Sequence, residues 1–415
     1  MHASYAKKYT LPLVIVMSLA WGIAGMAHNA TPLLFPFFSD TFQMTPQNNG
    51  YLASTLSGCW VLSILVSGIA APKIGNLKYL FACFLLTAAA LLLLSWSASI
   101  IAFYALIGVI GFGAGAIVPI SFSVLAKYTS PKNRGLFFGL VMACYVFIGT
   151  AGAATLLPNI ADKWNWNSSF LVLAVLFLIV TLCFFALRRV DEDIARNKAI
   201  AADEANVSSA SQWQLLKQLF QYRNIRITVI CGPAISIWFL TVCAYSVLYL
   251  MEAHHFDPVT AAFIFNGFGI GSAFGDLLPI ASDYIGRRIT IFLATAIGMA
   301  CFACYLWLPL SIPWMMIFFG ISGFLFSGVM SLFFSIVPSE AVPPDLLETA
   351  TTYNPAFTEF MGGTLAPSLV AMLSLYLSLS SIMDLLLLLP SLALAGVLFM
   401  KETAPRVLER KAKKT

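Results

Sequence analysis

The residues most able to do chemistry in this sequence are a few ionisable side chains inside long apolar runs. Glu359, Asp276 and His28, the last beside Asn29, each lie in a run long enough to cross a bilayer. An ionisable group at the bilayer centre costs roughly 2.5–3.5 kcal/mol on insertion scales, so each one requires a reason. Glu359 can be a neutral acid that hydrogen-bonds between helices, or it can bind and release a proton. We favour the proton-coupling role.

Two of these groups have strong alternative interpretations. Asp276 is a second candidate for proton coupling, although its position just before Asp283 favours membership of a charged network at the end of that run. His28 and Asn29 can bind a solute, and the histidine can also relay a proton. An ordinary hydrogen bond between helices explains them equally well.

Aromatic and amide residues supply further candidates for solute binding. Tyr245 and Tyr249 are spaced i, i+4, and Trp238 stands two turns earlier, so all three share one helical face. Asn354 precedes a proline in the run that contains Glu359, so these residues can line a cavity in the carboxyl-terminal half. Helix packing and anchoring at the membrane interface are the alternatives. The amino-terminal half offers weaker candidates, namely Tyr51, Ser54, Ser57 and Tyr145.

Several absences limit the chemistry. No Lys or Arg lies inside any apolar run, which disfavours a dianionic or phosphorylated solute and leaves neutral solutes, monocarboxylates carried with a proton, and cations. Cys301 and Cys304 have redox spacing but no partner pair, and the other cysteines also lie in apolar runs, where Cys behaves as a small apolar residue. We therefore expect no disulfide, no metal, no cofactor and no enzymatic activity.

The composition places these residues in a membrane. Of 415 residues, 60% are hydrophobic and 10% are charged, which excludes a soluble enzyme, and the net charge of +5 is too small for a nucleic-acid-binding domain. The apolar runs are continuous and do not alternate with period two, so they predict helices and not barrel strands. Twelve runs are expected, near 11–38, 48–71, 77–97, 99–127, 134–158, 168–187, 226–250, 259–282, 289–308, 313–337, 347–375 and 380–400.

The cations predict the orientation of these spans. Loops on the cytoplasmic side carry an excess of Lys and Arg. With both termini in the cytoplasm, every Lys and Arg except Lys163 falls on that side. We therefore expect a multi-pass protein of the cell (inner or plasma) membrane.

A polar interruption divides the chain. It predicts an amino-terminal six-helix bundle (1–187), a cytoplasmic linker (188–225), a carboxyl-terminal six-helix bundle (226–400) and a basic tail (401–415). Near the end of the linker, apolar residues share one helical face and suit a short helix on the membrane surface. These residues are Trp213, Leu216, Leu219 and Phe220.

A turn motif occurs at equivalent places in the two halves. The first copy contains Gly68, Lys73 and Gly75, and the second contains Asp283, Gly286, Arg287 and Arg288. Both copies resemble the signature Gly-x-x-x-Asp-Arg-x-Gly-Arg-Arg of the major facilitator superfamily, and residues 163–170 resemble its Trp-Arg-Trp-x-Phe element. In that superfamily the motif implies a conformational latch. The first copy has Pro72 in place of the Asp and is therefore incomplete.

The resemblance covers the whole chain and implies an all-α fold of two pseudo-symmetric six-helix bundles that transports by alternating access. We expect a monomer whose partners are a small-molecule solute, a proton and the lipid bilayer. The preferred function is proton-coupled symport of a monocarboxylate-like or neutral polar metabolite. A proton-coupled exporter of drugs, lipids or metabolites is the alternative, and Ile107 argues against it because such exporters often carry an Arg there. A solute sensor that does not transport is the third hypothesis.

Overall fold

The chain folds into helices that account for the predicted spans. The computed structural model describes residues 2–128, 137, 140–187, 212–275 and 277–412. Within those residues it contains twelve helical segments long and apolar enough to cross a membrane, and no strand. The twelve-span, all-α architecture expected from hydropathy is therefore confirmed.

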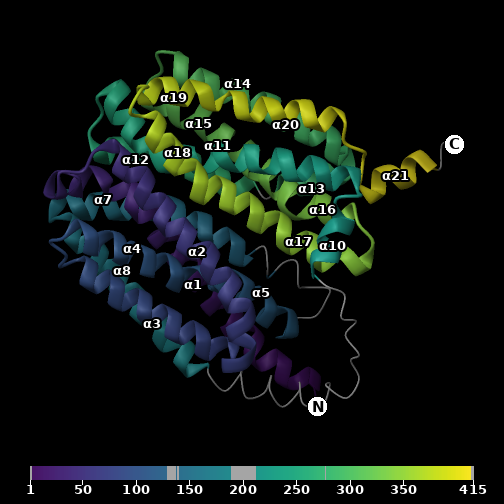
Figure 1. Ribbon diagram of the computed structural model, residues 1–415, viewed down its shortest axis with the longest axis horizontal. Coiled ribbons are helices and arrows are strands. Elements are labelled where there is room, and N and C mark those ends of the chain that lie inside the picture. Colours follow the sequence, from purple (N-terminus) through teal and green to yellow (C-terminus); the bar gives the residue numbers. More distant parts are fainter. Residues whose placement is uncertain (1, 129–136, 138–139, 188–211, 276, 413–415) are drawn as a thin grey trace. The chain divides into compact units, whose positions relative to one another are not determined.

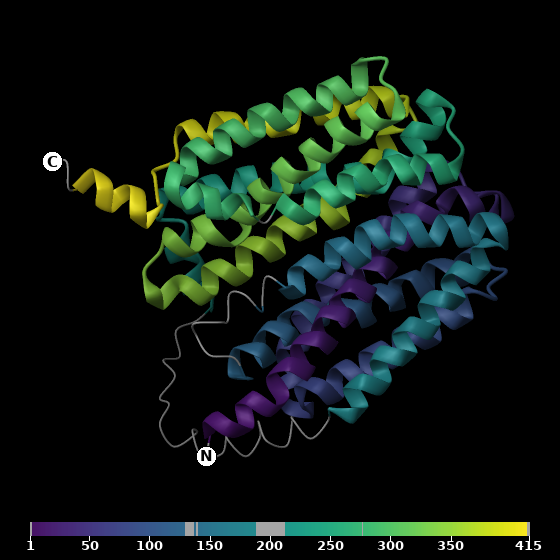
Figure 2. The same ribbon diagram turned by 180° about the vertical axis from the view of Figure 1, so that it is seen from behind.

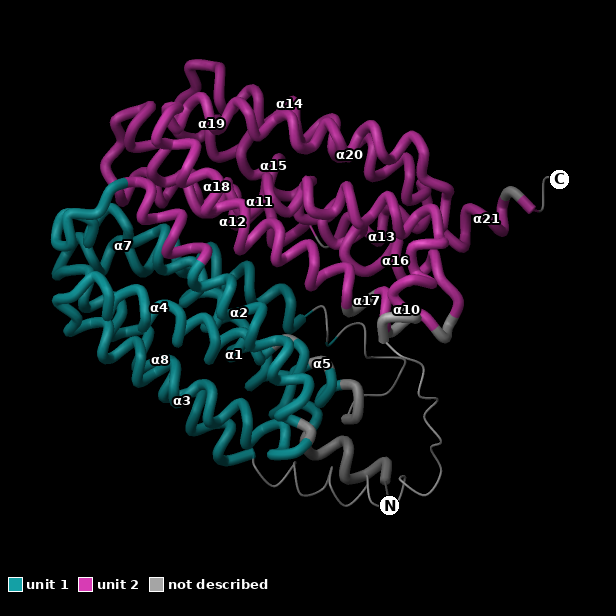
Figure 3. Tube along the Cα trace, in the orientation of Figure 1, with its two compact units in different colours: residues 1–45, 55–208 teal, residues 46–54, 209–415 magenta. Residues whose placement is uncertain are grey.

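The chain forms two compact units, which are described separately. Unit 1 comprises residues 1–45 and 55–208, and unit 2 comprises residues 46–54 and 209–415. The boundary falls inside helix α2 (Pro46–Ile74), whose first turns carry the colour of unit 2 in Figure 3. One reason is a hydrogen bond at 2.7 Å from the Asn49 side-chain amide to the Ala244 carbonyl. Residues 188–211 of the predicted linker lie outside the described residues.

Unit 1 is built around helix α1, which packs against the helices of the fifth and sixth spans, while α3 lies alongside α4 and α8 (Figure 1). Its elements besides α2 are α1 (His2–Phe38), η1 (Asp40–Phe42), α3 (Asn76–Leu94), α4 (Ile100–Gly115), α5 (Ile117–Tyr128), η2 (Tyr145–Gly152), α7 (Ala153–Lys163) and α8 (Trp166–Ala186).

Unit 2 is organised around α11, and its closest helix pair is α12 with α15, where small residues let the backbones approach. Figure 2 shows the last helix, α21, leaving one end of the unit toward the carboxyl terminus. The elements are α10 (Gln212–Leu219), α11 (Arg223–His254), α12 (Pro258–Gly275), α13 (Leu278–Ile285), α14 (Arg287–Trp307), α15 (Ile312–Ser331), η3 (Leu332–Ile336), α16 (Val337–Glu340), α17 (Pro344–Glu359), η4 (Phe360–Leu365), α18 (Ala366–Leu373), α19 (Leu379–Leu386), α20 (Leu388–Leu398) and α21 (Pro405–Ala412).

Three of these elements, η2, η3 and η4, are π-helical segments inside longer helices. A π-helix bonds i to i+5, which widens the turn, and such segments occur frequently at functional sites. Segment η2 begins with Tyr145, and η4 begins directly after Glu359. Tyr145 and Glu359, two residues predicted from the sequence to be functional, therefore lie at junctions between a regular α-helix and a wider π-helix.

Helix α10 has the predicted helical form, and two residues of its predicted apolar face, Leu216 and Leu219, pack on protein. Leu219 is buried in a cluster with Ile225, Leu346 and Ala350, and Leu216 packs against that cluster. The start of α11 and the first turns of α17 supply these partners. Phe220, just after the helix, stays exposed.

Candidate functional site

A polar and aromatic cluster occupies the interior of unit 1, and we call it the unit 1 cluster. Its members come from three elements, α1, α2 and η2. The Trp21 ring lies 4.6 Å from the Tyr145 ring and 5.8 Å from the Trp60 ring, measured between centroids. The remaining members are His28 and Ser57. The structure thus brings the predicted residues His28 and Tyr145 together with two tryptophans that the sequence did not single out.

His28 is the polar centre of the unit 1 cluster. Its Nε2 atom lies 3.4 Å from the Ser57 hydroxyl oxygen, and its ring meets Trp60 edge-on with centroids 5.2 Å apart. His28 and Tyr145 are half-buried, whereas Trp21, Ser57 and Trp60 are buried. The indole Nε1 of Trp21 has no hydrogen-bond acceptor among the described residues.

Asn29 joins α1 to the π-helical segment beside this cluster. Its side-chain nitrogen donates to the Gly25 carbonyl at 2.9 Å and to the Gly149 carbonyl at 3.2 Å. Gly25 lets the two elements touch, because an added Cβ would fall 2.7 Å from the Tyr145 ring. Asn29 therefore fixes the segment that carries Tyr145 in place.

Glu359 ends helix α17 in unit 2. It is half-buried, and its carboxyl has no hydrogen-bond or ion-pair partner among the described residues. The thiol of Cys243 on α11 lies within electrostatic range of it. Nearby, Gly362 in η4 packs directly against Ser236 of α11. The predicted proton-coupling residue is thus an unpaired acid at the junction of a regular and a wide helix.

Asn354, one turn before Glu359, performs a task like that of Asn29. Its side-chain nitrogen donates to the Phe333 carbonyl at 2.7 Å and to the Phe334 carbonyl at 3.3 Å, both in η3. Its own carbonyl accepts a bond from the Thr358 hydroxyl at 2.7 Å. Asn354 is 4% exposed, so its donors are committed to the π-helical segment of the neighbouring span.

The aromatic face predicted on α11 divides between two surroundings. Tyr245 is buried, and its hydroxyl donates to the Pro367 carbonyl of α18 at 3.2 Å. Trp238 belongs to a closed aromatic core, which we call the unit 2 cluster. Its ring centroid lies 4.0 Å from that of Phe326 and 4.9 Å from that of Phe302. Tyr249 borders this core, 6.1 Å from Tyr305. The unit 2 cluster consists of Trp238, Phe268, Phe302, Tyr305, Phe319 and Phe326.

The second copy of the turn motif is a charged network at the α13–α14 turn. The Arg287 guanidinium donates to Asp283 at 2.5 Å and to Glu340 at 2.8 and 3.2 Å. It also reaches the Pro279 carbonyl at 2.9 Å and the Ser282 hydroxyl. Arg288 turns the other way and donates to the Leu398 carbonyl at 2.7 Å. Asp283 and Arg287 therefore meet as the sequence predicts.

The acids Glu340 and Glu402 complete this network and were missed by sequence reasoning. One Glu402 oxygen accepts the Arg287 backbone N–H at 2.8 Å, and the other accepts that of Arg288 at 3.3 Å. The turn glycine Gly286 has φ +113°, and an added Cβ there would crowd Glu402. Thr403 donates to Glu340 at 2.7 Å. For Glu402 the sequence did contain a signal, because this acid directly follows the last apolar run in a segment whose other charged residues are mostly cations.

The first copy of the motif keeps the shape of the turn, and neither of the two ion pairs found among the described residues lies there. Gly75 has φ +109°, close to the value at Gly286, and begins α3 as Gly286 begins α14. Lys73 is exposed, and an added Cβ on Gly68 would touch nothing. Both ion pairs among the described residues involve Arg287. Asp276 lies outside the described residues.

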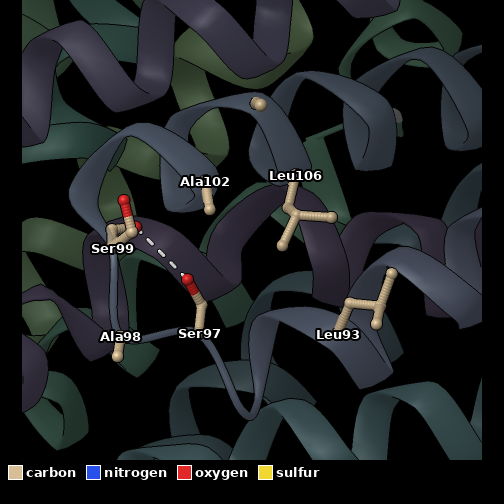
Figure 4. Close-up of a pocket in the computed structure, with 7 residues that line it drawn as sticks. Leu93, Ser97, Ala98, Ser99, Ala102 and Leu106 are labelled. Atoms are coloured by element: carbon tan, nitrogen blue, oxygen red, sulfur yellow. Dashed lines mark hydrogen bonds between the residues drawn. The ribbon is translucent and has the colours of Figure 1, made fainter.

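A surface depression of about 620 Å³ lies at the connection between α3 and α4 (Figure 4). Leu93, Ser97, Ala98, Ser99, Ala102, Ala105 and Leu106 line it. Its lining is mainly apolar and contains none of the predicted site residues, and the Ser97 hydroxyl donates to the Ser99 carbonyl at 3.2 Å. Among the described residues, no group of three or more His, Cys, Asp or Glu side chains is placed to hold a metal ion.

Comparison with known proteins identifies the class. The family model of the Major Facilitator Superfamily matches residues 15–367, so the chain belongs to that superfamily of membrane transporters. Over 96% of its length it is 22% identical to a protein named for niacin and nicotinamide transport, NiaP of Bacillus subtilis (strain 168), and covers 97% of that protein.

Solved structures show the same fold. The nucleoside transporter NupG superimposes with a TM-score of 0.72 at 16% identity, covering 94% of this chain and 99% of that one. A bacterial homologue of the human lysosomal transporter Spinster, in an inward-facing and unoccupied conformation, superimposes with a TM-score of 0.69 at 12% identity. The superposition covers 94% of each chain. At these identities the likeness is one of fold. The transporter class rests on the family match, and the described residues contain twelve helical segments long and apolar enough to span a membrane.

Proposed function

We propose that this protein is a proton-coupled symporter that carries a small monocarboxylate-like solute by alternating access. The observation that carries the proposal is the unpaired Glu359 carboxyl in the eleventh span. A carboxyl is neutral while it holds a proton and bears the cost of an unpaired charge when it does not. A change of conformation that alters its surroundings therefore drives proton binding or release, which is what coupling requires.

The solute class is supported by the charge pattern. No span holds a Lys or Arg in its interior, so nothing there balances a multiply charged anion. A monocarboxylate that enters with one proton moves no net charge into such an interior. The relative named for niacin and nicotinamide and the neighbour named as a nucleoside transporter both concern small organic solutes, and niacin is itself a monocarboxylate.

The second copy of the motif supports a latch on the cytoplasmic side. The positive-inside pattern favours a cytoplasmic position for both termini and for the α13–α14 turn, in a protein of the cell membrane. The Arg287, Asp283 and Glu340 network is then a latch component that unit 2 supplies by itself. Asp276, as a neighbour of this turn in sequence, is proposed to act with it. The protein acts as a monomer.

Transport in proteoliposomes tests the coupling. Wild-type protein and a Glu359→Gln variant are compared for uptake of labelled nicotinate under an inward proton gradient and for counterflow exchange without one. We expect the variant to lose accumulation and keep exchange, because glutamine fills the same space and cannot release a proton.

Asp384→Asn is the matched control. Asp384 is an acid near the start of the twelfth span, and its carboxyl accepts a hydrogen bond from the Trp307 indole at 2.8 Å, so it is already paired. This variant should accumulate nicotinate like the wild type. If Glu359→Gln still concentrates nicotinate up the proton gradient, Glu359 is not the coupling residue and the proposal loses its main support.

A further inference from the structure

We propose that the unit 1 cluster binds the flat ring of an aromatic or heteroaromatic monocarboxylate, with Trp21 and Trp60 as residues that determine specificity. This inference rests on the proposed function and names its substrate class. It adds roles for Trp21, Ser57 and Trp60 beside His28 and Tyr145.

The arrangement of rings favours a planar ligand. Trp21 and Tyr145 are tilted by 33° with centroids 4.6 Å apart, and His28 meets Trp60 edge-on at 5.2 Å. The His28 and Tyr145 centroids are 6.5 Å apart. Offset and edge-on contacts at these separations are the geometries that aromatic quadrupoles prefer. A further flat ring can join such a set, whereas a saturated ring offers hydrogens on both faces and no complementary quadrupole.

The polar atoms of the unit 1 cluster favour an acceptor on that ring. The Trp21 Nε1–H is buried and has no acceptor among the described residues, a state that it shares with the Trp238 Nε1–H and the Tyr305 hydroxyl of the unit 2 cluster. Of these three side chains, only Trp21 contacts a half-buried ring within the described part of the chain, that of Tyr145. The Ser57 hydroxyl and the imidazole of His28 are already within reach of each other. No acidic side chain belongs to the cluster, so an organic cation would find aromatic faces but no counter-charge. A carboxylate or ring nitrogen supplies the missing acceptor.

The unit 1 cluster is also open where a bundle core is closed. Every member of the unit 2 cluster is at most 1% exposed, so its rings are sealed against one another. In the unit 1 cluster His28 and Tyr145 are half-buried, while Trp21, Ser57 and Trp60 are buried. The two half-buried rings are the ones through which a ligand reaches the cluster, and each contacts a tryptophan, His28 with Trp60 and Tyr145 with Trp21.

The test compares two acids of similar size and equal charge, benzoate and cyclohexanecarboxylate, for binding to the purified full-length protein in detergent. We expect the wild type to bind benzoate at least tenfold more tightly. Trp60→Leu should reduce that preference to less than threefold, and Trp60→Phe should restore most of it because the ring returns. Benzylammonium, an aromatic cation, should bind more weakly than benzoate.

Each failure has its own meaning. Equal affinity for benzoate and cyclohexanecarboxylate in the wild type overturns the claim that the ligand is aromatic, and leaves the monocarboxylate transporter intact. Binding of benzylammonium that is tighter than that of benzoate overturns the claim that the ligand is an acid. A Trp60→Phe variant that does not recover the preference removes the role of the ring at this position, whatever happens to Trp60→Leu. If neither acid binds or is transported, the monocarboxylate function fails together with this inference.

Discussion

The two units use similar residues in opposite ways. Unit 2 seals its aromatic side chains into a core in which Tyr305 stacks on Phe319 at 4.3 Å and 9°, and it closes its motif turn with two ion pairs. Unit 1 mixes its rings with a histidine and a serine, leaves part of them exposed, and has an exposed lysine at its motif turn. We infer that unit 2 provides stability and the latch, whereas unit 1 provides the surface that meets the solute.

The comparison also shows that two buried tryptophans can have different surroundings. Trp60 and Trp238 are both buried tryptophans in the middle of spans, with 6% and 0% exposure. What distinguishes them is their neighbours, since Trp60 contacts an imidazole and Trp238 contacts phenylalanines. This difference in neighbours is the reason why we propose that the solute binds at Trp60 and not at Trp238.

The largest expected effect is on the sealed core. Trp238→Ala should lower the free energy of unfolding by about 3–5 kcal/mol because it opens a large cavity among packed rings. His28→Ala should cost less than about 1 kcal/mol, since the side chain is half-buried, while weakening solute binding. Thermal unfolding in detergent measures both. Similar losses for the two variants would show that the unit 1 cluster is a core as well.

The next effect concerns the two motif turns. Arg287→Met should destabilise the protein by about 3 kcal/mol, because it leaves Asp283 and Glu340 without their cationic partner. This value is the low end of the range for breaking a buried ion pair, since the Asp283 side chain is 40% exposed. Lys73→Met should stay within about 0.5 kcal/mol. The same unfolding assay applies. A substantial loss from Lys73→Met would mean that the amino-terminal turn carries its own charged contact.

A smaller effect distinguishes the two asparagines that serve π-helical segments. Asn29→Ala and Asn354→Ala should each cost about 1–2 kcal/mol, since each leaves a segment carbonyl without its side-chain donor. Only Asn29→Ala should also reduce benzoate affinity, by displacing Tyr145. Paired unfolding and binding measurements decide this. Loss of affinity in Asn354→Ala alone would move the solute to unit 2.

The smallest effect lies at the start of α12. Asp257 precedes this helix, and its Oδ1 accepts the backbone N–H groups of Val259 and Thr260 at 3.0 Å each. Hydrogen bonding from Thr260 lowers the pKa of Asp257 below its ordinary value of 3.8. A carboxyl whose pKa is lower in the folded state stabilises the folded protein at pH values above its unfolded-state pKa. This stabilisation is lost as the pH falls through the folded-state pKa.

Asp257→Ala should therefore cost about 1 kcal/mol at pH 7, the usual loss for a helix cap, and less as the pH falls below 3.8 toward the lowered folded-state pKa. Melting temperatures of the variant and the wild type at pH 7 and at a pH below 3.8 measure this. An equal cost at both pH values would mean that the carboxylate charge is irrelevant to the cap.

Hydropathy was enough to predict the spans, because a bilayer demands long apolar helices whatever their partners. The turn motif predicted the meeting of Asp283 with Arg287 because the two residues are one helical turn apart in sequence. Glu402 could not be predicted in the same way, since its partner Arg287 lies more than a hundred residues away. Nor does helical periodicity tell whether the face carrying Trp238 meets other rings or a solute. The π-helical segments have no simple sequence signal, so the roles of Asn29 and Asn354 emerged only from the structure.

The central claim is that the solute is held in unit 1 and the proton in unit 2. The most direct measurement is the proton uptake that benzoate evokes in proteoliposomes, corrected for the leak of protein-free vesicles, in wild type and Glu359→Gln, alongside benzoate binding to both. We predict that Glu359→Gln binds benzoate within threefold of wild type and evokes no proton uptake. Proton uptake that persists in Glu359→Gln would contradict the account.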